Sequence, residues 1–181
     1  MRKKGELLFL TALAYAFLGW CYEVFLEVVV YHWGFSNRGF LHGPYCPVYG
    51  FGALLLLACL RPIRQKRLHW RGIPLSPLLV FLGTMALTTA LELATSYILE
   101  AVTGGWLWDY HRYALQFDGR IALNPSVRFG LGGVLILYGI QPLLERFASW
   151  LGERRCHILA WVLGIVFLLD FVVTAAGVIG G

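Results

Sequence analysis

Long apolar runs separated by short polar connections limit what this chain can fold into more than any other feature. A transmembrane helix needs about 20 consecutive, mostly apolar residues. Five segments come near that length, at 7–31, 47–60, 75–102, 125–144 and 157–179. Only 14% of the residues are charged, against about 25% in soluble domains. The sequence therefore predicts an all-α integral membrane protein, with one transmembrane domain over residues 1–181 and about five transmembrane helices.

The distribution of Lys and Arg predicts how these helices are oriented. Basic residues cluster in three segments, at 2–4, 61–71 and 146–155. If five spans alternate in direction, the three segments share one side, and the positive-inside rule makes that side the cytoplasm. We therefore expect a cytoplasmic N-terminus. The net charge of +5 is then explained by basic loops at lipid headgroups, with membrane lipid and not nucleic acid as the partner.

Acidic side chains fall inside the predicted spans. A charge at the centre of a bilayer costs at least ~2.5–3.5 kcal/mol, so a partner or a use is expected for each. Glu23 lies 16 residues after Leu7, and Glu92 lies 17 residues after Leu75. At about 1.5 Å per residue, both carboxylates reach the outer half of the hydrocarbon core. We expect Glu23 and Glu92 to lie at one level.

These acids need cations or protons nearby. Glu27 follows Glu23 by one helical turn, and two ionised carboxylates at that spacing repel each other in a low dielectric. The candidate cations are Arg38, Arg112 and Arg128.

Arg128 lies in the first turn of the fourth predicted span, for which Asn124 is the expected N-cap and Pro125 the first helical residue. A cation at that position opposes the helix dipole, so a carboxylate partner is expected. Asp170, about midway along the last span, stands alone in the sequence. It is interpreted either as a protonated or hydrogen-bonded packing residue or as part of a site.

The stretch "NRGFLHGPYCPVYGFG" (37–52) lies between the first two spans. Pro44, Pro47 and the nearby glycines prevent a regular helix, and the second span is too short to cross alone. Residues 34–47 are therefore predicted to enter the outer half of the membrane as a re-entrant or broken segment packed against the first and third helices. The alternative is an ordinary exposed loop. Irregular backbone at membrane depth is tolerated where it is buried in protein or lines a polar cavity.

A second outer loop, "GGWLWDYHRYALQFDG" (104–119), is rich in Trp and Tyr. It is interpreted as the rim or lid of a site, and the alternative is an aromatic belt at the membrane interface. Together, the two loops and the intramembrane charges predict a substrate-binding site. It comprises Glu23, Arg38, His42, Tyr45, Tyr49, Glu92, Trp108, Asp109, Tyr110 and Arg128.

The pattern N-R-G-F-x-x-G-P-x-x-P-x-Y-G, preceded by "LGWCYE" and followed by "WDY", resembles the bacterial membrane family of ABC-transporter type IV proteins, also called CmpB-like permeases. The resemblance covers roughly residues 10–145. It implies a protein of the bacterial plasma membrane with a permease function, and it names no substrate. The residues that match are Gly19, Trp20, Glu23, Asn37, Arg38, Gly39, Gly43, Pro44, Pro47, Tyr49, Gly50, Trp108, Asp109 and Tyr110.

Three functions remain open at this point. The leading hypothesis is a small permease that binds or moves a small solute. No GxxxxGK[ST] motif is present, so an ATPase would be a separate subunit, for which "RFASWLGERR" (146–155) is a candidate docking segment. The second is an intramembrane enzyme acting on a lipid, with His42 or His111 in acid–base roles; no metal or cofactor motif supports it. The third is a scaffold. A second copy of the chain is a further candidate partner.

Overall fold

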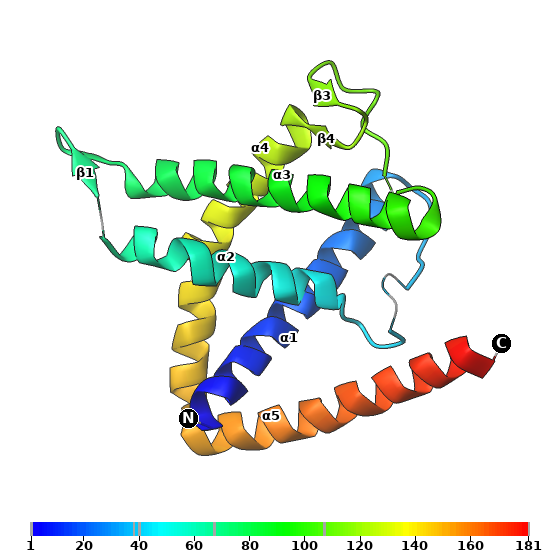
Figure 1. The fold of residues 1–181 in the computed structure, drawn as a ribbon. Coiled ribbons are helices and arrows are strands. Elements are labelled where there is room, and N and C mark those ends of the chain that lie inside the picture. Colours follow the sequence, from blue (N-terminus) through cyan, green and yellow to red (C-terminus); the bar gives the residue numbers. More distant parts are fainter. Residues whose placement is uncertain (1, 38, 40, 67, 107, 181) are drawn as a thin grey trace. The chain divides into compact units, whose positions relative to one another are not determined.

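The computed structural model describes residues 2–37, 39, 41–66, 68–106 and 108–180. Within these residues, four helical stretches are long and apolar enough to cross a membrane: Lys4–Val30, Pro47–Lys66, Ser76–Val102 and Leu123–Gly177. The predicted all-α membrane fold is therefore confirmed, and the described part of the chain carries two short β-hairpins besides its helices (Figure 1).

The fourth stretch contains both the fourth and the fifth predicted spans. It has 55 residues, which at 1.5 Å per residue is about 80 Å, more than twice the ~30 Å hydrocarbon core. It consists of α4 (Leu123–Val134), the π-helix η2 (Leu135–Ile140) and α5 (Gln141–Gly180). The backbone of α5 leaves the helical conformation at Gly152, where φ is 76° and ψ is 164°. A residue other than glycine is strained at that φ, so Gly152 is where the chain separates the two spans.

The chain divides into two compact units. Unit 1 comprises Met1–Leu55 and Leu143–Gly181, and unit 2 comprises Leu56–Pro142. Unit 1 thus contains α1, the start of α2 and nearly all of α5, whereas unit 2 contains the rest of α2 together with α3 and α4.

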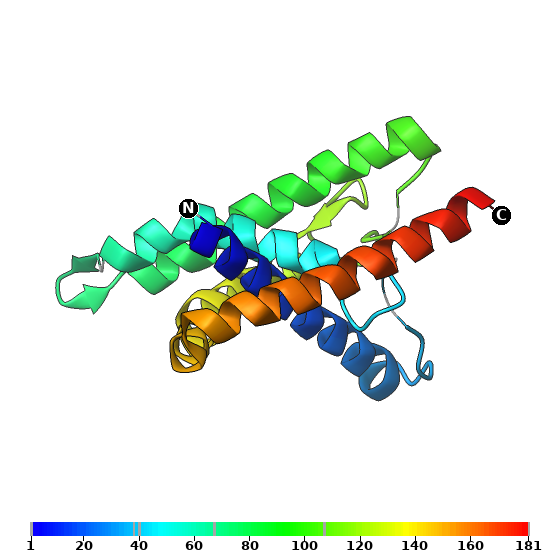
Figure 2. The same ribbon diagram turned by 90° about the horizontal axis from the view of Figure 1, so that it is seen from below.

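In unit 1, α1 (Arg2–Phe25) runs on into the π-helix η1 (Leu26–Val30). The start of α2 packs closely on α1, as Figures 1 and 2 show. A Cβ at Gly50 would come within 2.4 Å of the backbone oxygen of Ala12, and one at Gly19 would meet the ring of Tyr49 at 2.2 Å. Small residues let membrane helices approach to this distance, so these two glycines set the α1–α2 contact.

The second span is longer than predicted. α2 occupies Pro47–Lys66, 20 residues, and contains Pro62. The prediction that it ends near Leu60 and cannot cross alone was therefore wrong. A proline in a helix removes only one backbone hydrogen bond, and the long side chains of Arg64 and Lys66 can reach toward the headgroups while their stems stay in apolar surroundings.

In unit 2, α3 (Ser76–Thr103) packs against α4 at two glycines. A Cβ at Gly133 would lie 2.1 Å from Oγ1 of Thr84, and one at Gly130 would meet Phe81 at 2.7 Å. α3 starts close to the predicted boundary. It ends at Gly104, which has the left-handed conformation (φ 80°) and donates its N–H to the Glu100 carbonyl at 2.9 Å, as helix C-caps commonly do.

Two antiparallel hairpins flank α3. β1 (His69–Trp70) pairs with β2 (Ile73–Pro74), and β3 (Gln116–Phe117) pairs with β4 (Ile121–Ala122). The second hairpin lies beside the C-terminal end of α3 and the start of α4 (Figure 1). It therefore brings the Trp- and Tyr-rich loop to the last turns of α3.

The start of α4 differs from the prediction. Ala122 is the N-cap, with extended backbone and no side-chain cap, and α4 begins at Leu123. Asn124 is therefore not the N-cap, because the pairing of Ala122 with Gln116 in the hairpin fixes where extended structure ends. Pro125 still lies in the first helical turn, where its missing N–H costs nothing.

Candidate functional site

The segment between α1 and α2 is broken, as predicted, while its predicted packing against α3, which belongs to the other unit, stays a prediction. The described part of residues 31–46 contains no helix, and α2 starts only at Pro47. Leu41, Tyr45 and Cys46 are buried, and the Cys46 N–H donates to the Ala16 carbonyl at 3.0 Å. Ala16 lies near the middle of the apolar stretch Lys4–Val30. The end of the segment therefore reaches the middle of α1, whereas residues 31–37 are exposed.

Asp170 on α5 anchors this segment. Its Oδ2 accepts the Gly43 N–H at 2.9 Å and the Tyr45 hydroxyl at 2.6 Å, and its Oδ1 accepts the His42 N–H at 3.1 Å. The His42 Nδ1 lies 2.8 Å from the Thr174 hydroxyl. Burial and the hydrogen bond to Asp170 raise the pKa of Tyr45 to about 12, so the phenol keeps its proton and donates it. Figures 1 and 2 show the segment next to α5.

The side chain of Asn37, which belongs to the same segment, stabilises it through hydrogen bonds to its backbone. Its Nδ2 donates to the His42 carbonyl at 2.8 Å and to the Leu41 carbonyl at 3.3 Å, and its Oδ1 accepts from the Trp20 Nε1 at 2.8 Å. Asn37 thus satisfies backbone groups that the missing helix leaves unpaired. Asn37 and Trp20 both match the family pattern, and their contact gives that match a physical role.

Glu27 is held by the same segment. It is buried, and its Oε1 and Oε2 accept the Ser36 hydroxyl at 2.8 and 2.9 Å. This hydroxyl is a neutral partner that the sequence did not indicate, since Ser36 lies nine residues away beyond the end of the π-helix.

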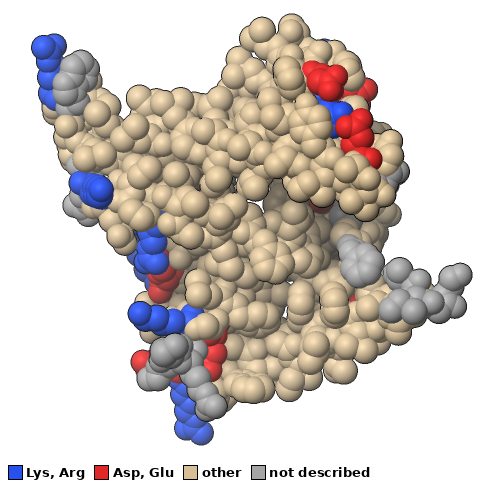
Figure 3. Space-filling view, in the orientation of Figure 1, with Lys and Arg blue, Asp and Glu red and all other residues tan. Residues whose placement is uncertain are grey.

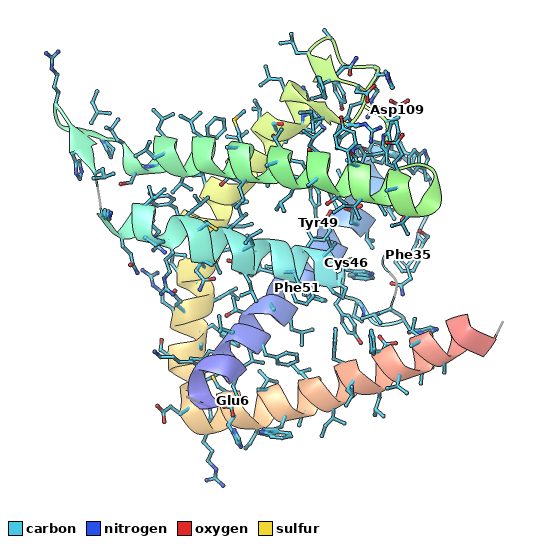
Figure 4. The ribbon with its side chains drawn as sticks, in the orientation of Figure 1. Glu6, Phe35, Cys46, Tyr49, Phe51 and Asp109 are labelled. Carbon is cyan, nitrogen blue, oxygen red and sulfur yellow. The ribbon has the colours of Figure 1, made fainter. Side chains whose placement is uncertain are left out.

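Glu23 and Tyr49 line a cavity of about 650 Å³ in unit 1. The Tyr49 hydroxyl donates to Oε1 of Glu23. The walls are otherwise mainly apolar, and they include Phe51 at the start of α2 and Phe167 and Phe171 on α5. Figure 4 shows Tyr49, Cys46 and Phe51 at the start of α2, beside α1. The cavity therefore combines apolar walls with one hydrogen-bonded carboxyl group.

Arg38 lies outside the described residues, as does Phe40. Gly39 and Leu41 line the cavity next to Glu23. The expectation that Arg38 pairs with Glu23, Glu27, Glu92 or Asp109 therefore stays a prediction.

In unit 2, Glu92 and Tyr110 come together. The Tyr110 hydroxyl donates to Oε1 of Glu92 at 2.8 Å. Oε2 of Glu92 is buried and has no hydrogen-bond partner among the residues described. Burial, followed by the bond to Glu92, raises the pKa of Tyr110. The pair thus leaves one buried oxygen open to a proton or a ligand.

Trp108 and Asp109 form hydrogen bonds with residues other than Glu92. Trp108 donates its Nε1 to the Arg120 carbonyl at 2.8 Å. Asp109 is exposed and accepts the His111 N–H at 2.9 Å and contacts the His111 Nδ1 at 2.6 Å. The backbone bond from His111 is the main cause that lowers the pKa of Asp109.

Arg120, which the sequence did not single out, is the most heavily engaged cation described in unit 2. It is 4% exposed. Its Nη2 lies 2.6 Å from Glu100 and its Nε lies 2.9 Å from Asp118. Its guanidinium lies over the rings of Trp106 and Tyr97, at 4.0 and 4.2 Å from their centroids. The hydrogen bond to Asp118 is the main cause that raises its pKa. Figure 3 shows acidic and basic side chains gathered there, over β3–β4 and the end of α3.

Arg128 is exposed on α4. Within the described residues of unit 2 it makes no ion pair, so the expected carboxylate partner is not found there. In this unit it is Arg120, and not Arg128, that pairs with Glu100 and Asp118.

The predicted site residues thus form two groups. The expectation that Glu23 and Glu92 lie at one level stays a prediction, since they belong to different units. Glu23, His42, Tyr45 and Tyr49 lie in unit 1, and Glu92, Trp108, Asp109, Tyr110 and Arg128 lie in unit 2.

His42, a candidate acid–base residue of the enzyme hypothesis, is part of the hydrogen-bonded anchor. The His42 ring contacts Asp170 and Thr174, which also hold the backbone of the segment. Among the described residues, no three His, Cys, Asp or Glu side chains are grouped to bind a metal ion. The arrangement can hold a ligand between apolar walls and a carboxyl group.

The family model described as "Putative ABC-transporter type IV" matches residues 10–175. The match extends beyond the predicted limit near 145 and includes Asp170 and Thr174, so both sides of the hydrogen-bonded anchor lie within it. No curated protein and no solved structure matches the chain.

Proposed function

The chain belongs to the ABC-transporter type IV family, and from that premise we propose that it is a permease-type membrane component that binds and moves a small solute. The observation that carries the proposal is the cavity of unit 1, where the Glu23 carboxyl and the Tyr49 hydroxyl meet between apolar walls. Ionisable groups within membrane spans mark solute or proton pathways by default.

The chemistry of the cavity supports a particular class of solute. Ligand sites are mostly apolar, with a few polar groups that fix orientation. Here the polar group is an acid, and aromatic rings such as Phe51 and Phe167 can face a cation. We propose a small organic cation with an apolar body. Arg38 would neutralise Glu23 until the solute arrives.

The remaining members of the proposed site belong to unit 2. The open oxygen of Glu92 supports a role in binding a proton or the same solute. Trp108, Asp109, Tyr110 and Arg128 would bind with Glu92 within unit 2. The proposed setting is one transmembrane domain in the bacterial plasma membrane, with an ATPase, if one is recruited, at residues 146–155.

Orientation can be tested by labelling. In a variant without native cysteines, a single cysteine at Leu115, which is exposed, should react with an impermeant maleimide added outside intact cells. One at Lys66 should react only after the cells are opened. The positive-inside count gives this expectation, and the reverse pattern would overturn both the orientation and the outward-facing site.

The solute can be tested with tetraphenylphosphonium as a probe. Glu23→Gln keeps the shape and an acceptor for the Tyr49 hydroxyl, but removes the negative charge. Hydrogen bonds and contacts to a charged group are worth about 1.5–3 kcal/mol, so binding to the purified chain should weaken roughly 10- to 100-fold by calorimetry.

Glu6→Gln is the matched control, because Glu6 lies on the same helix, outside the residues lining the cavity, and pairs with His157 at 2.9 Å. It should bind the probe as the unmodified chain does. Equal affinity of the unmodified chain and Glu23→Gln would show that the cavity does not select a cation.

A further inference from the structure

A second cavity of unit 1 has no role in the proposed function. It has a volume of about 470 Å³ and lies between α1 and α5. Its lining is almost entirely apolar. We call it the leaflet groove and define it by Leu7, Leu10, Ala14 and Phe17 on α1 and by Leu159 and Leu163 on α5.

The leaflet groove has the length of one lipid leaflet. Leu7 and Phe17 are ten residues apart on α1, or about 15 Å at 1.5 Å per residue. That is half of a ~30 Å hydrocarbon core. Pro44 and Tyr45 line it as well, and they precede Cys46, which bonds to Ala16 near the middle of α1. The broken segment therefore closes the groove at the depth where a lipid tail ends.

The other end of the groove is basic. His157 pairs with Glu6 at 2.9 Å, so the residues just before His157 lie beside the start of α1. Arg154 and Arg155 are exposed there, as is Lys4. Figure 3 shows Lys and Arg side chains, with some acidic side chains among them, over the start of α1 and the adjoining part of α5. A phosphate at the mouth of the groove would meet this positive charge.

Exposed aromatic side chains lie near the basic end of the groove, where Phe147 is one of the lining residues. Trp150 is 72% exposed and Phe147 is 54% exposed, and their rings stack at 5.7 Å. Exposed aromatic rings are enriched where membrane meets water. The apolar groove, its closed inner end and its basic, aromatic mouth thus match the parts of one phospholipid.

We propose that the leaflet groove holds one acyl chain of an anionic phospholipid, whose phosphate is bound by Arg154 and Arg155. Basic clusters at the ends of membrane helices attract anionic headgroups. Each Lys or Arg raises the affinity about fivefold. Because Pro44 and Tyr45 line the groove, the lipid would contact the broken segment that Asp170 holds.

The test is native mass spectrometry of the full chain in detergent, titrated with dioleoylphosphatidylglycerol or dioleoylphosphatidylcholine. We expect one phosphatidylglycerol per chain and weaker binding of phosphatidylcholine. Arg154→Ala with Arg155→Ala should weaken phosphatidylglycerol binding roughly 30-fold, since each basic residue contributes about a fivefold factor. Arg64→Ala with Lys66→Ala, which removes the same charge from unit 2, should leave it unchanged.

Ala14→Phe tests the groove itself, because the larger side chain would fill it. This variant should lose phosphatidylglycerol while unfolding at the same temperature in detergent as the unmodified chain, which shows that it is folded. Leu163→Phe gives a second filling variant from the α5 side. The proposal is overturned if both lipids bind alike, if the two double variants behave alike, if the filled grooves keep the lipid, or if a dimer without lipid covers the groove. None of these outcomes depends on Glu23.

Discussion

Asp170→Ala is expected to destabilise the chain by about 3 kcal/mol, the largest loss among the substitutions considered. Asp170 accepts the N–H groups of His42 and Gly43 and the hydroxyl of Tyr45. Hydrogen bonds to a charged group contribute about 1.5–3 kcal/mol each, and buried donors left unpaired add a desolvation cost. The three bonds act together, so their contributions are not additive. Thermal unfolding in detergent measures the loss.

Local opening of the segment gives a second readout. Cys46 is buried at the end of the segment, and in a variant without the other cysteines its reaction with a maleimide should be slow. Asp170→Ala should accelerate it. Thr174→Val is the control, because it removes only contacts to His42 and to one oxygen of Asp170 and should change stability by less than about 1 kcal/mol. Unchanged stability and unchanged Cys46 labelling in Asp170→Ala would contradict the anchoring role.

Arg120→Ala is expected to loosen the outer loop and to lower the unfolding temperature by roughly 5 °C or more. The guanidinium is buried between Trp106 and Tyr97 and binds Glu100 and Asp118 at 2.6 and 2.9 Å. Its removal takes away two ring contacts and two ion pairs at once. Limited proteolysis should then cut residues 104–122 faster than in the unmodified chain.

Arg120→Lys separates charge from shape. An ammonium keeps the positive charge but cannot lie flat between two rings or bind two carboxylates as a planar fork does, so it should restore less than half of the loss. Arg112→Ala is the matched control in the same loop, because Arg112 is exposed and its guanidinium lies 5.2 Å from the Tyr113 ring centroid. If Arg120→Ala and Arg112→Ala behave alike, Arg120 does not hold the loop.

For Asp170 and Arg120, the structure shows binding partners that the sequence does not reveal. In the sequence, Asp170 is an intramembrane charge without an evident partner, and nothing distinguishes Arg120 from the other polar residues of its loop. In the opposite direction, Arg128 was expected to find a carboxylate and is exposed. The position of a charge in a predicted span therefore does not identify the residue that it contacts.

The amino-acid sequence was enough to predict that the chain spans a membrane, where most helices begin and end, and that the chain is broken before α2. These depend on local properties: the length of an apolar run, and the inability of Pro44, Pro47 and nearby glycines to continue a helix. It also located the family pattern, whose Trp20 and Asn37 are in contact.

Only the tertiary structure decided which polar groups meet. His42 and Asp170 are 128 residues apart, and Arg120 reaches Glu100 across 20 residues. A helix that is apolar on all sides carries no periodic signal for the face that it buries. Which side chains pair therefore depends on how the helices pack, as the contact of Gly50 with Ala12 illustrates for α1 and α2.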